Sequence, residues 1–199
     1  MLKGGAMLKL INSLFVFLIV IGSTSLLIAQ ESEDQSPEMQ AWMEYMTPGP
    51  MHEMMAKAVG DWNVKTKFWM DPAGEPMETE GKATMEMILG GRYLKATHTG
   101  TMMGMPFEGI NLQGYDNATG EFTAIWIDNM GTGFSISNGK YDEATNSINF
   151  EGSMLDPMTK EDMKFRQVVK TIDDNHFMFE MYSNYNGKEF KSMVVDYTR

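Results

Sequence analysis

The chain of 199 residues contains no cysteine, which excludes disulfide cross-links, a lipid-anchored cysteine and a thiol nucleophile. It is also short of basic side chains, with 16 lysines and arginines against 27 acidic residues. Surfaces that bind nucleic acids are basic because they attract phosphates, so we expect no nucleic-acid partner. The chain also lacks a Gly-x-Ser-x-Gly turn and a phosphate-binding glycine loop, so nucleophilic catalysis has no support.

A single long apolar stretch lies near the N-terminus, where Lys3 and Lys9 precede an almost continuously apolar run over residues 10–20. Small polar residues follow, and Ala29 comes just before a polar, acidic segment. This order is typical of a secretory signal peptide over residues 1–29, so we predict cleavage after Ala29 and a periplasmic or secreted protein. The alternative is a retained membrane anchor, although the run is short for a span of roughly 20 residues.

Residues 30–59 are predicted to form a flexible start followed by two short helices rich in methionine. Residues 30–37 are polar and unpatterned, which favours disorder. The helices then place apolar residues at helical spacing: Met39, Trp42, Met43 and Met46 in the first, and Met51, Met54 and Met55 in the second. Helices this short are unstable alone in water, so we expect both to lie against the rest of the fold.

From Gly60 to Arg199, apolar residues alternate with polar ones instead of following a helical period. Turn-forming residues interrupt this alternation at short intervals. The pattern predicts ten strands, over residues 62–70, 79–89, 92–101, 107–115, 121–128, 134–141, 147–154, 163–172, 176–185 and 189–198. Short connections make neighbours in sequence neighbours in space, and ten meandering strands expose long edges unless the sheet closes. We therefore predict an all-β domain over residues 60–199, a closed antiparallel up-and-down β-barrel.

The start of the first strand, Gly60-x-Trp62 behind a short helix, resembles the signature of lipocalins and other calycins. In those barrels the tryptophan closes the bottom and an arginine from a late strand packs over it. The resemblance gives the closing role to Gly60 and Trp62, and it gives the role of the packing arginine to Arg199.

Longer motifs extend the resemblance over nearly all of the mature chain. They are Pro48-Gly49-Pro50, Trp69-Met70-Asp71-Pro72 and the segments 88–94, 102–109, 114–117, 126–133 and 179–182. Together they resemble the bacterial domain-of-unknown-function family 1579. That family implies a calycin-like barrel and carries no established activity to transfer.

His98 is one of three histidines, and it shares a face of its predicted strand with Leu94 and Ala96. An inward imidazole could coordinate haem or a metal, or transfer protons near neutral pH. The structural alternative is a hydrogen-bonded histidine of the core.

Asp128, Arg166 and Glu180 are charged residues within strand-like runs. Charges enclosed in a small barrel must be paired or hydrogen-bonded, so three inward charges could orient the polar end of a ligand. The alternative is a solvated outer face or a structural ion pair. Trp126 accompanies Asp128 on its face, and Tyr182 accompanies Glu180.

Methionine is unusually abundant, with 22 residues, and Met105 belongs to a group of three around Gly104. Thioethers are soft ligands for Cu(I), and they also line adaptable apolar pockets. The methionines are spread along the chain, which favours packing over a dedicated copper site. The candidate ligand-binding residues are therefore His98, Met105, Trp126, Asp128, Arg166, Glu180 and Tyr182.

These observations predict an exported barrel that binds a small apolar or amphipathic molecule, with no stable membrane span after cleavage. The sequence requires no cofactor or metal and assigns no catalytic residue. Three alternatives stay open. The barrel could be an isomerase or cyclase acting through His98, Asp128 and Glu180, it could bind haem or copper, or it could be a solid structural or interaction module.

Overall fold

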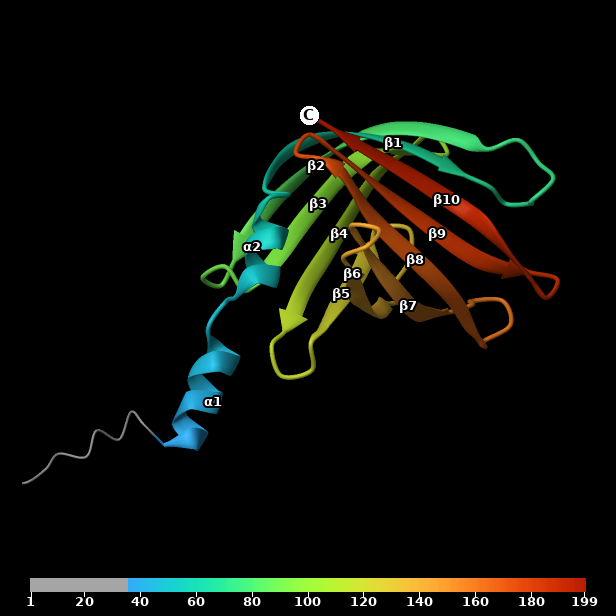
Figure 1. Ribbon diagram of the computed structural model, residues 1–199. Coiled ribbons are helices and arrows are strands. Elements are labelled where there is room, and N and C mark those ends of the chain that lie inside the picture. The colour runs from blue at the N-terminus through green and yellow to red at the C-terminus, as the bar shows by residue number, and fades with distance from the viewer. Residues whose placement is uncertain (1–35) are drawn as a thin grey trace, which may run out of the picture. The chain divides into compact units, whose positions relative to one another are not determined.

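Ten antiparallel strands close into a barrel in the computed structural model, which describes residues 36–199 (Figure 1). The predicted signal peptide, residues 1–29, and residues 30–35 lie outside the described part. The strands are β1 (Gly60–Phe68), β2 (Met77–Ile88), β3 (Tyr93–Met102), β4 (Met105–Asp116), β5 (Glu121–Asp128), β6 (Ser135–Asp142), β7 (Ser147–Leu155), β8 (Asp162–Asp173), β9 (His176–Tyr185) and β10 (Lys188–Thr198). Each strand pairs with its neighbours in sequence, and β1 pairs with β10. The predicted up-and-down barrel is confirmed.

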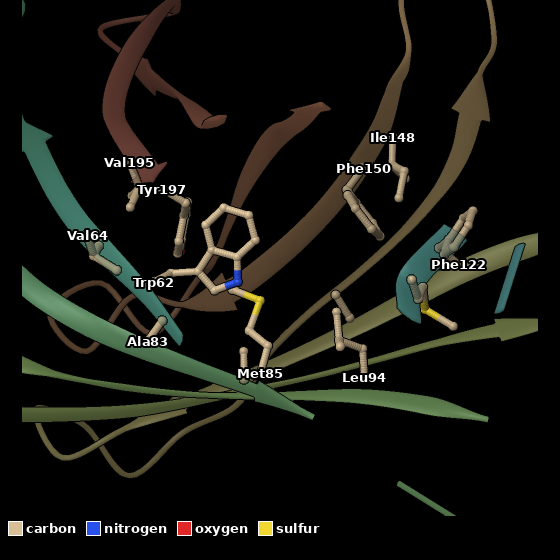
Figure 2. Close-up of a cluster of buried hydrophobic side chains, with 13 residues drawn as sticks. Trp62, Val64, Ala83, Met85, Leu94, Phe122, Ile148, Phe150, Val195 and Tyr197 are labelled. Carbon is tan, nitrogen blue, oxygen red and sulfur yellow. The ribbon is translucent and has the colours of Figure 1, made fainter. Parts of the chain in front are cut away.

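The helix α2 (Pro50–Ala56) packs against β2, β3 and β4 at one end of the barrel. Its Met55 is only 3% exposed and belongs to the hydrophobic core, while Met51 and Met54 pack against that core. Side chains from strands all around the barrel point into the same interior, and the Trp62 indole is among them (Figure 2). Two phenylalanines, Phe122 and Phe150, are essentially inaccessible to solvent. The end of the barrel beneath α2, which we call the closed end, is therefore a packed core.

The helix α1 (Pro37–Met46) differs from the expectation that both helices lie against the barrel, because none of its residues is buried. Trp42 is 60% exposed, and the methionines of α1 are exposed as well. Side chains of the barrel hold the end of the helix: Asn117 donates to the carbonyls of Glu44 and Thr47, each at 2.8 Å, and Arg92 donates to the carbonyl of Met46 at 2.6 Å. These bonds reach main-chain carbonyls and bury no side chain. The helical spacing of the apolar residues in α1 therefore predicted a helix correctly but not its burial. No helix within residues 36–199 combines the length and apolar character needed to cross a bilayer.

Aromatic side chains of the barrel lie over glycines on the neighbouring strand. A Cβ atom added to Gly109 would lie 2.5 Å from the Trp126 ring, and one added to Gly152 would lie 2.7 Å from the Phe165 ring. Because glycine has no side chain, these rings can lie close to the barrel wall. Small residues at inward positions therefore decide where the large ones pack.

Candidate ligand-binding site

Arg199 and Trp62 join the end of the last strand, β10, to the first strand, β1, at the closed end of the barrel. The guanidinium carbon of Arg199 lies 4.3 Å from the centre of the Trp62 ring. Its nitrogens donate to the carbonyl oxygens of Val59 at 2.7 Å, Lys57 at 3.2 Å and Asp174 at 2.7 Å. The indole of Trp62 in turn donates to the carbonyl of Ala58 at 2.8 Å.

Gly60 makes room for this arrangement. Its φ of +129° is rarely adopted by residues with a side chain, and an added Cβ would lie 3.1 Å from Arg199 Nη1. Gly60, Trp62 and Arg199 therefore link β1, the segment after α2 and the end of β10.

His98 points into the barrel from β3 and is only 8% exposed. Its Nε2 atom lies 3.0 Å from the hydroxyl of Tyr197, and its ring packs edgewise against the rings of Tyr197 and Trp126. Burial lowers the pKa of His98 to about 4, and the nearby carbonyl of Ala96 opposes this shift only in part. Burial likewise raises the pKa of Tyr197. Both groups are therefore uncharged at neutral pH.

The hydrogen bonding of His98 is incomplete, because its Nδ1 atom is buried and forms no hydrogen bond of normal geometry. If the Tyr197 hydroxyl donates to Nε2, the single ring proton of the neutral imidazole is on Nδ1, where it is buried without a hydrogen-bond acceptor. In this arrangement Nδ1 is buried and Nε2 is bonded to the Tyr197 hydroxyl. Among residues 36–199, no group of three His, Asp or Glu side chains could hold a metal ion.

Trp126 and Asp128 lie on the inward face of β5, near the end of the barrel opposite α2, which we call the open end. One carboxylate oxygen of Asp128 accepts a hydrogen bond of 2.7 Å from Trp126 Nε1, and the other accepts one of 2.9 Å from the backbone of Met130. The Trp126 ring stacks on the ring of Phe107, with centroids 6.3 Å apart. The structure thus fixes a carboxylate and two aromatic rings beside one another.

Arg166, Glu180 and Tyr182 lie on the outside of the barrel, so an inward placement of these residues is wrong. The register pairs Arg166 with Tyr182 on one face, and it turns Phe165, Gln167 and Met181 to the other, inner face. Both faces of β9 are half-buried, so its sequence shows no clear alternation. With Glu180 outside, the residues proposed for an isomerase do not meet in one place.

The outward charges form ion pairs. Arg166 donates to both oxygens of Glu189, at 3.1 and 3.0 Å, and lies over the Tyr182 ring. Glu180 accepts from Tyr182 at 2.7 Å and pairs with Lys191. Burial acts to raise the pKa of Glu180, but the hydrogen bonds from Lys191 and Tyr182 outweigh it and lower the pKa. The cluster is a structural network of the outer surface.

Met105 is 49% exposed and stands on the rim of the open end. Methionines that are far apart in sequence gather on this rim, because alternate hairpin turns of an up-and-down barrel meet at one end. The exposed ones are Met70, Met77, Met103, Met105, Met130, Met158 and Met163. The sequence showed these residues as spread along the chain, and only the topology brings them together.

A groove opens on the same rim, where β2 and β3 stop pairing beyond Gly81 and Gly100. The two strands come close at this point, since a Cβ added to Gly81 would lie 2.5 Å from the carbonyl oxygen of Thr99. Beyond it they diverge and leave a cavity of about 450 Å³. Its lining residues are Phe68, Met77, Glu78, Thr79, Glu80, Thr101, Met103 and Gly104. The sequence reasoning missed this groove, although two glycines within strands were a signal of close strand approach.

Inward apolar side chains near the open end are less buried than those beneath α2. Phe68, Phe107, Met154 and Met181 are all half-buried, although the register turns each of them to the inner face. The interior is therefore accessible to solvent from the open end.

The fold and this interior define the class of the protein: a closed ten-stranded antiparallel β-barrel, packed at one end and accessible at the other. The chain belongs to the family DUF1579, described as a protein of unknown function, which it matches over residues 47–199.

Among solved structures, the chain is similar to Rv2717c from M. tuberculosis, with 16% identity and a TM-score of 0.58. That match covers 77% of this chain and 99% of the other and supports the fold alone. A redesigned β-barrel matches with 12% identity and a TM-score of 0.38, over 73% of this chain and 93% of the other. No protein of curated function matches the sequence.

Proposed function

We propose that the barrel binds a small, largely apolar or amphipathic molecule that enters at the open end. The observation that carries this proposal is the incomplete burial of inward Phe68, Phe107, Met154 and Met181 beside a groove of about 450 Å³. Apolar area that remains in contact with water can still be buried by a ligand, which contributes about 25 cal/mol per Å². Flexible methionines around the entrance suit ligands of varied shape.

The N-terminal pattern supports a site of action outside the cytoplasm, as part of the same proposal. N-terminal sequencing of the protein from its own host would find Gln30 as the first residue if the signal peptide is cleaved after Ala29. An intact N-terminus on membrane-associated protein would favour a retained anchor.

The first test of binding fills the groove. Thr79 lines it and is half-buried, so we expect Thr79→Trp to weaken binding of the uncharged dye Nile red at least tenfold. The matched control is Thr123→Trp, because Thr123 is exposed on the outer face of β5 and should leave the affinity unchanged. Fluorescence titration measures both affinities, and thermal melting shows that both variants fold.

Equal affinity of Thr79→Trp, Thr123→Trp and the unchanged protein would contradict this entrance. Native mass spectrometry of protein purified from its own host provides a second test, since a bound molecule survives gentle ionisation. A barrel that binds no dye and carries no molecule would be a solid module, and the proposal would then be abandoned.

A further inference from the structure

The inner wall of the barrel carries almost no ionised side chain. Its polar positions toward the middle and the open end hold uncharged groups: Thr66, Thr79, Asn111, Ser137, Gln167 and Ser183. His98, also inward, is neutral as described above. These hydroxyl and amide groups can form hydrogen bonds, but none offers a full positive charge to a ligand.

The cations near the open end do not face the interior. Arg166 and Lys191 lie on the outer face and are paired with Glu189 and Glu180. Lys188 has the register of an inward residue, but it stands at the tip of the β9–β10 hairpin and is exposed. Within residues 36–199, no lysine or arginine lies on the inner wall below the rim.

Asp128 is the exception to this uncharged wall. It is half-buried on the inward face of β5, and hydrogen bonds from Trp126 and Met130 fix its carboxylate at the open end. Each carboxylate oxygen keeps a further acceptor position. The stacked rings of Trp126 and Phe107 lie beside it, and aromatic faces attract cations.

These charges determine which polar end of a ligand the interior can accept. An anionic end would lose its hydration without gaining a cationic partner, and it would lie near the Asp128 carboxylate. A cationic end about 5 Å from that carboxylate would be attracted, which at an effective dielectric constant of 20 to 40 corresponds to an affinity gain of roughly tenfold or more.

On the basis of the proposed function, we infer that the ligand is a cationic or uncharged amphipath, and that amphipathic carboxylates and phosphates are excluded. Its polar end lies against Asp128 and Trp126, and its apolar part lies toward Phe179 and Met181, which the register turns to the inner face of β9. Asp128 sets the preference for a cationic end over an uncharged one.

The test compares three probes with the same ten-carbon chain and different ends: decyltrimethylammonium, decanol and decanoate. Each is titrated against Nile red bound to the full protein, the two ionic probes below their critical micelle concentrations and decanol below its solubility limit. We expect the ammonium probe to displace the dye at a concentration at least tenfold lower than decanoate, with decanol between them.

Two variants separate the role of Asp128 from that of the acidic surface. Asp128→Asn should reduce the advantage of the ammonium probe over decanol by about tenfold, because the amide removes the negative charge but keeps a hydrogen-bond acceptor. Glu151→Gln removes the same charge from an exposed position on the outer face of β7. It should change neither the ammonium-to-decanol nor the ammonium-to-decanoate affinity ratio. The comparison of probes on the unchanged protein holds even if Asp128→Asn fails to fold.

Each contrary outcome has a distinct meaning. Decanoate binding as tightly as the ammonium probe would overturn the inference and leave the proposed function standing. Equal effects of Asp128→Asn and Glu151→Gln would assign the preference to overall charge and overturn the role of Asp128. If neither Nile red nor any probe binds, the proposed function fails first.

Discussion

At the scale of single residues, burial decides what His98 and Arg199 do. The same imidazole that could bind a metal on a surface is kept neutral by the packed interior, and its bond to Tyr197 holds the ring in place. Arg199 acts differently, because its planar fork reaches three carbonyl groups while it covers Trp62. Both residues connect strands that are far apart in sequence.

His98 gives a pH dependence of stability. Its pKa is about 4 in the folded protein, against an ordinary value of 6.5, so the unfolded chain binds this proton more readily. The contribution of neutral His98 to the free energy of unfolding is therefore fully present above pH 6.5. It falls as the pH drops toward 4, by about 3 kcal/mol in total. Urea unfolding at several pH values measures this loss.

The His98→Gln variant should lack this part of the pH dependence, since glutamine does not titrate. His176→Gln is the control, because His176 is half-buried on the outer face beside Asp196 and its replacement should keep the His98 slope. Identical slopes for the unchanged protein and His98→Gln would show that burial does not depress the pKa of His98.

Arg199→Ala should destabilise the barrel by about 1–3 kcal/mol, because three charge-assisted hydrogen bonds and the contact with Trp62 are lost together. Arg199→Lys keeps the charge but not the fork, so it should restore only part of the loss. Arg166→Ala removes a comparable arginine that lies over Tyr182 in an exposed ion pair, and it should cost about 1 kcal/mol or less. Chemical denaturation ranks the three variants, and equal losses at positions 199 and 166 would refute a special role for Arg199.

At the scale of strands and hairpins, glycines decide where neighbouring strands and rings come close. Gly139 on β6 faces Phe150 on β7, and Gly152 faces Phe165 on β8. Gly81 and Gly100 bring β2 and β3 together just before these strands diverge. The packed wall and the groove thus depend on the same property, the absence of a side chain.

Gly139→Ala tests this dependence. An added Cβ would overlap the carbonyl oxygen of Asn149 and lie 2.7 Å from the Phe150 ring, so we expect a loss of about 1–3 kcal/mol. Gly133→Ala, in the β5–β6 turn, is the control because nothing lies within 4 Å of its added Cβ, and its effect should stay within about 0.5 kcal/mol. Thermal unfolding of both variants measures these effects. Equal melting temperatures would contradict the close approach of Asn149 and Phe150 to Gly139.

At the scale of the whole molecule, closure separates two ends with different properties. Beneath α2, the apolar residues are fully packed, while at the open end the same kinds of residue remain half-buried. Because alternate hairpins meet at one rim, residues from five turns share a single entrance. The proposed binding of an amphipathic ligand follows from this difference between the ends.

The sequence by itself determined the ten strands, their order and the closure of the barrel, because alternation and short turns act between neighbouring residues. It also pointed to His98 and Asp128 as polar residues on apolar faces. It could not orient Arg166 and Glu180, since half-buried residues on both faces of β9 leave the alternation ambiguous. Only the tertiary structure decided this orientation, the gathering of methionines on one rim, the exposure of α1 and the groove beside Gly81. Each of these depends on which elements come into contact in the folded protein. Contacts between residues far apart in sequence leave no local pattern in the sequence.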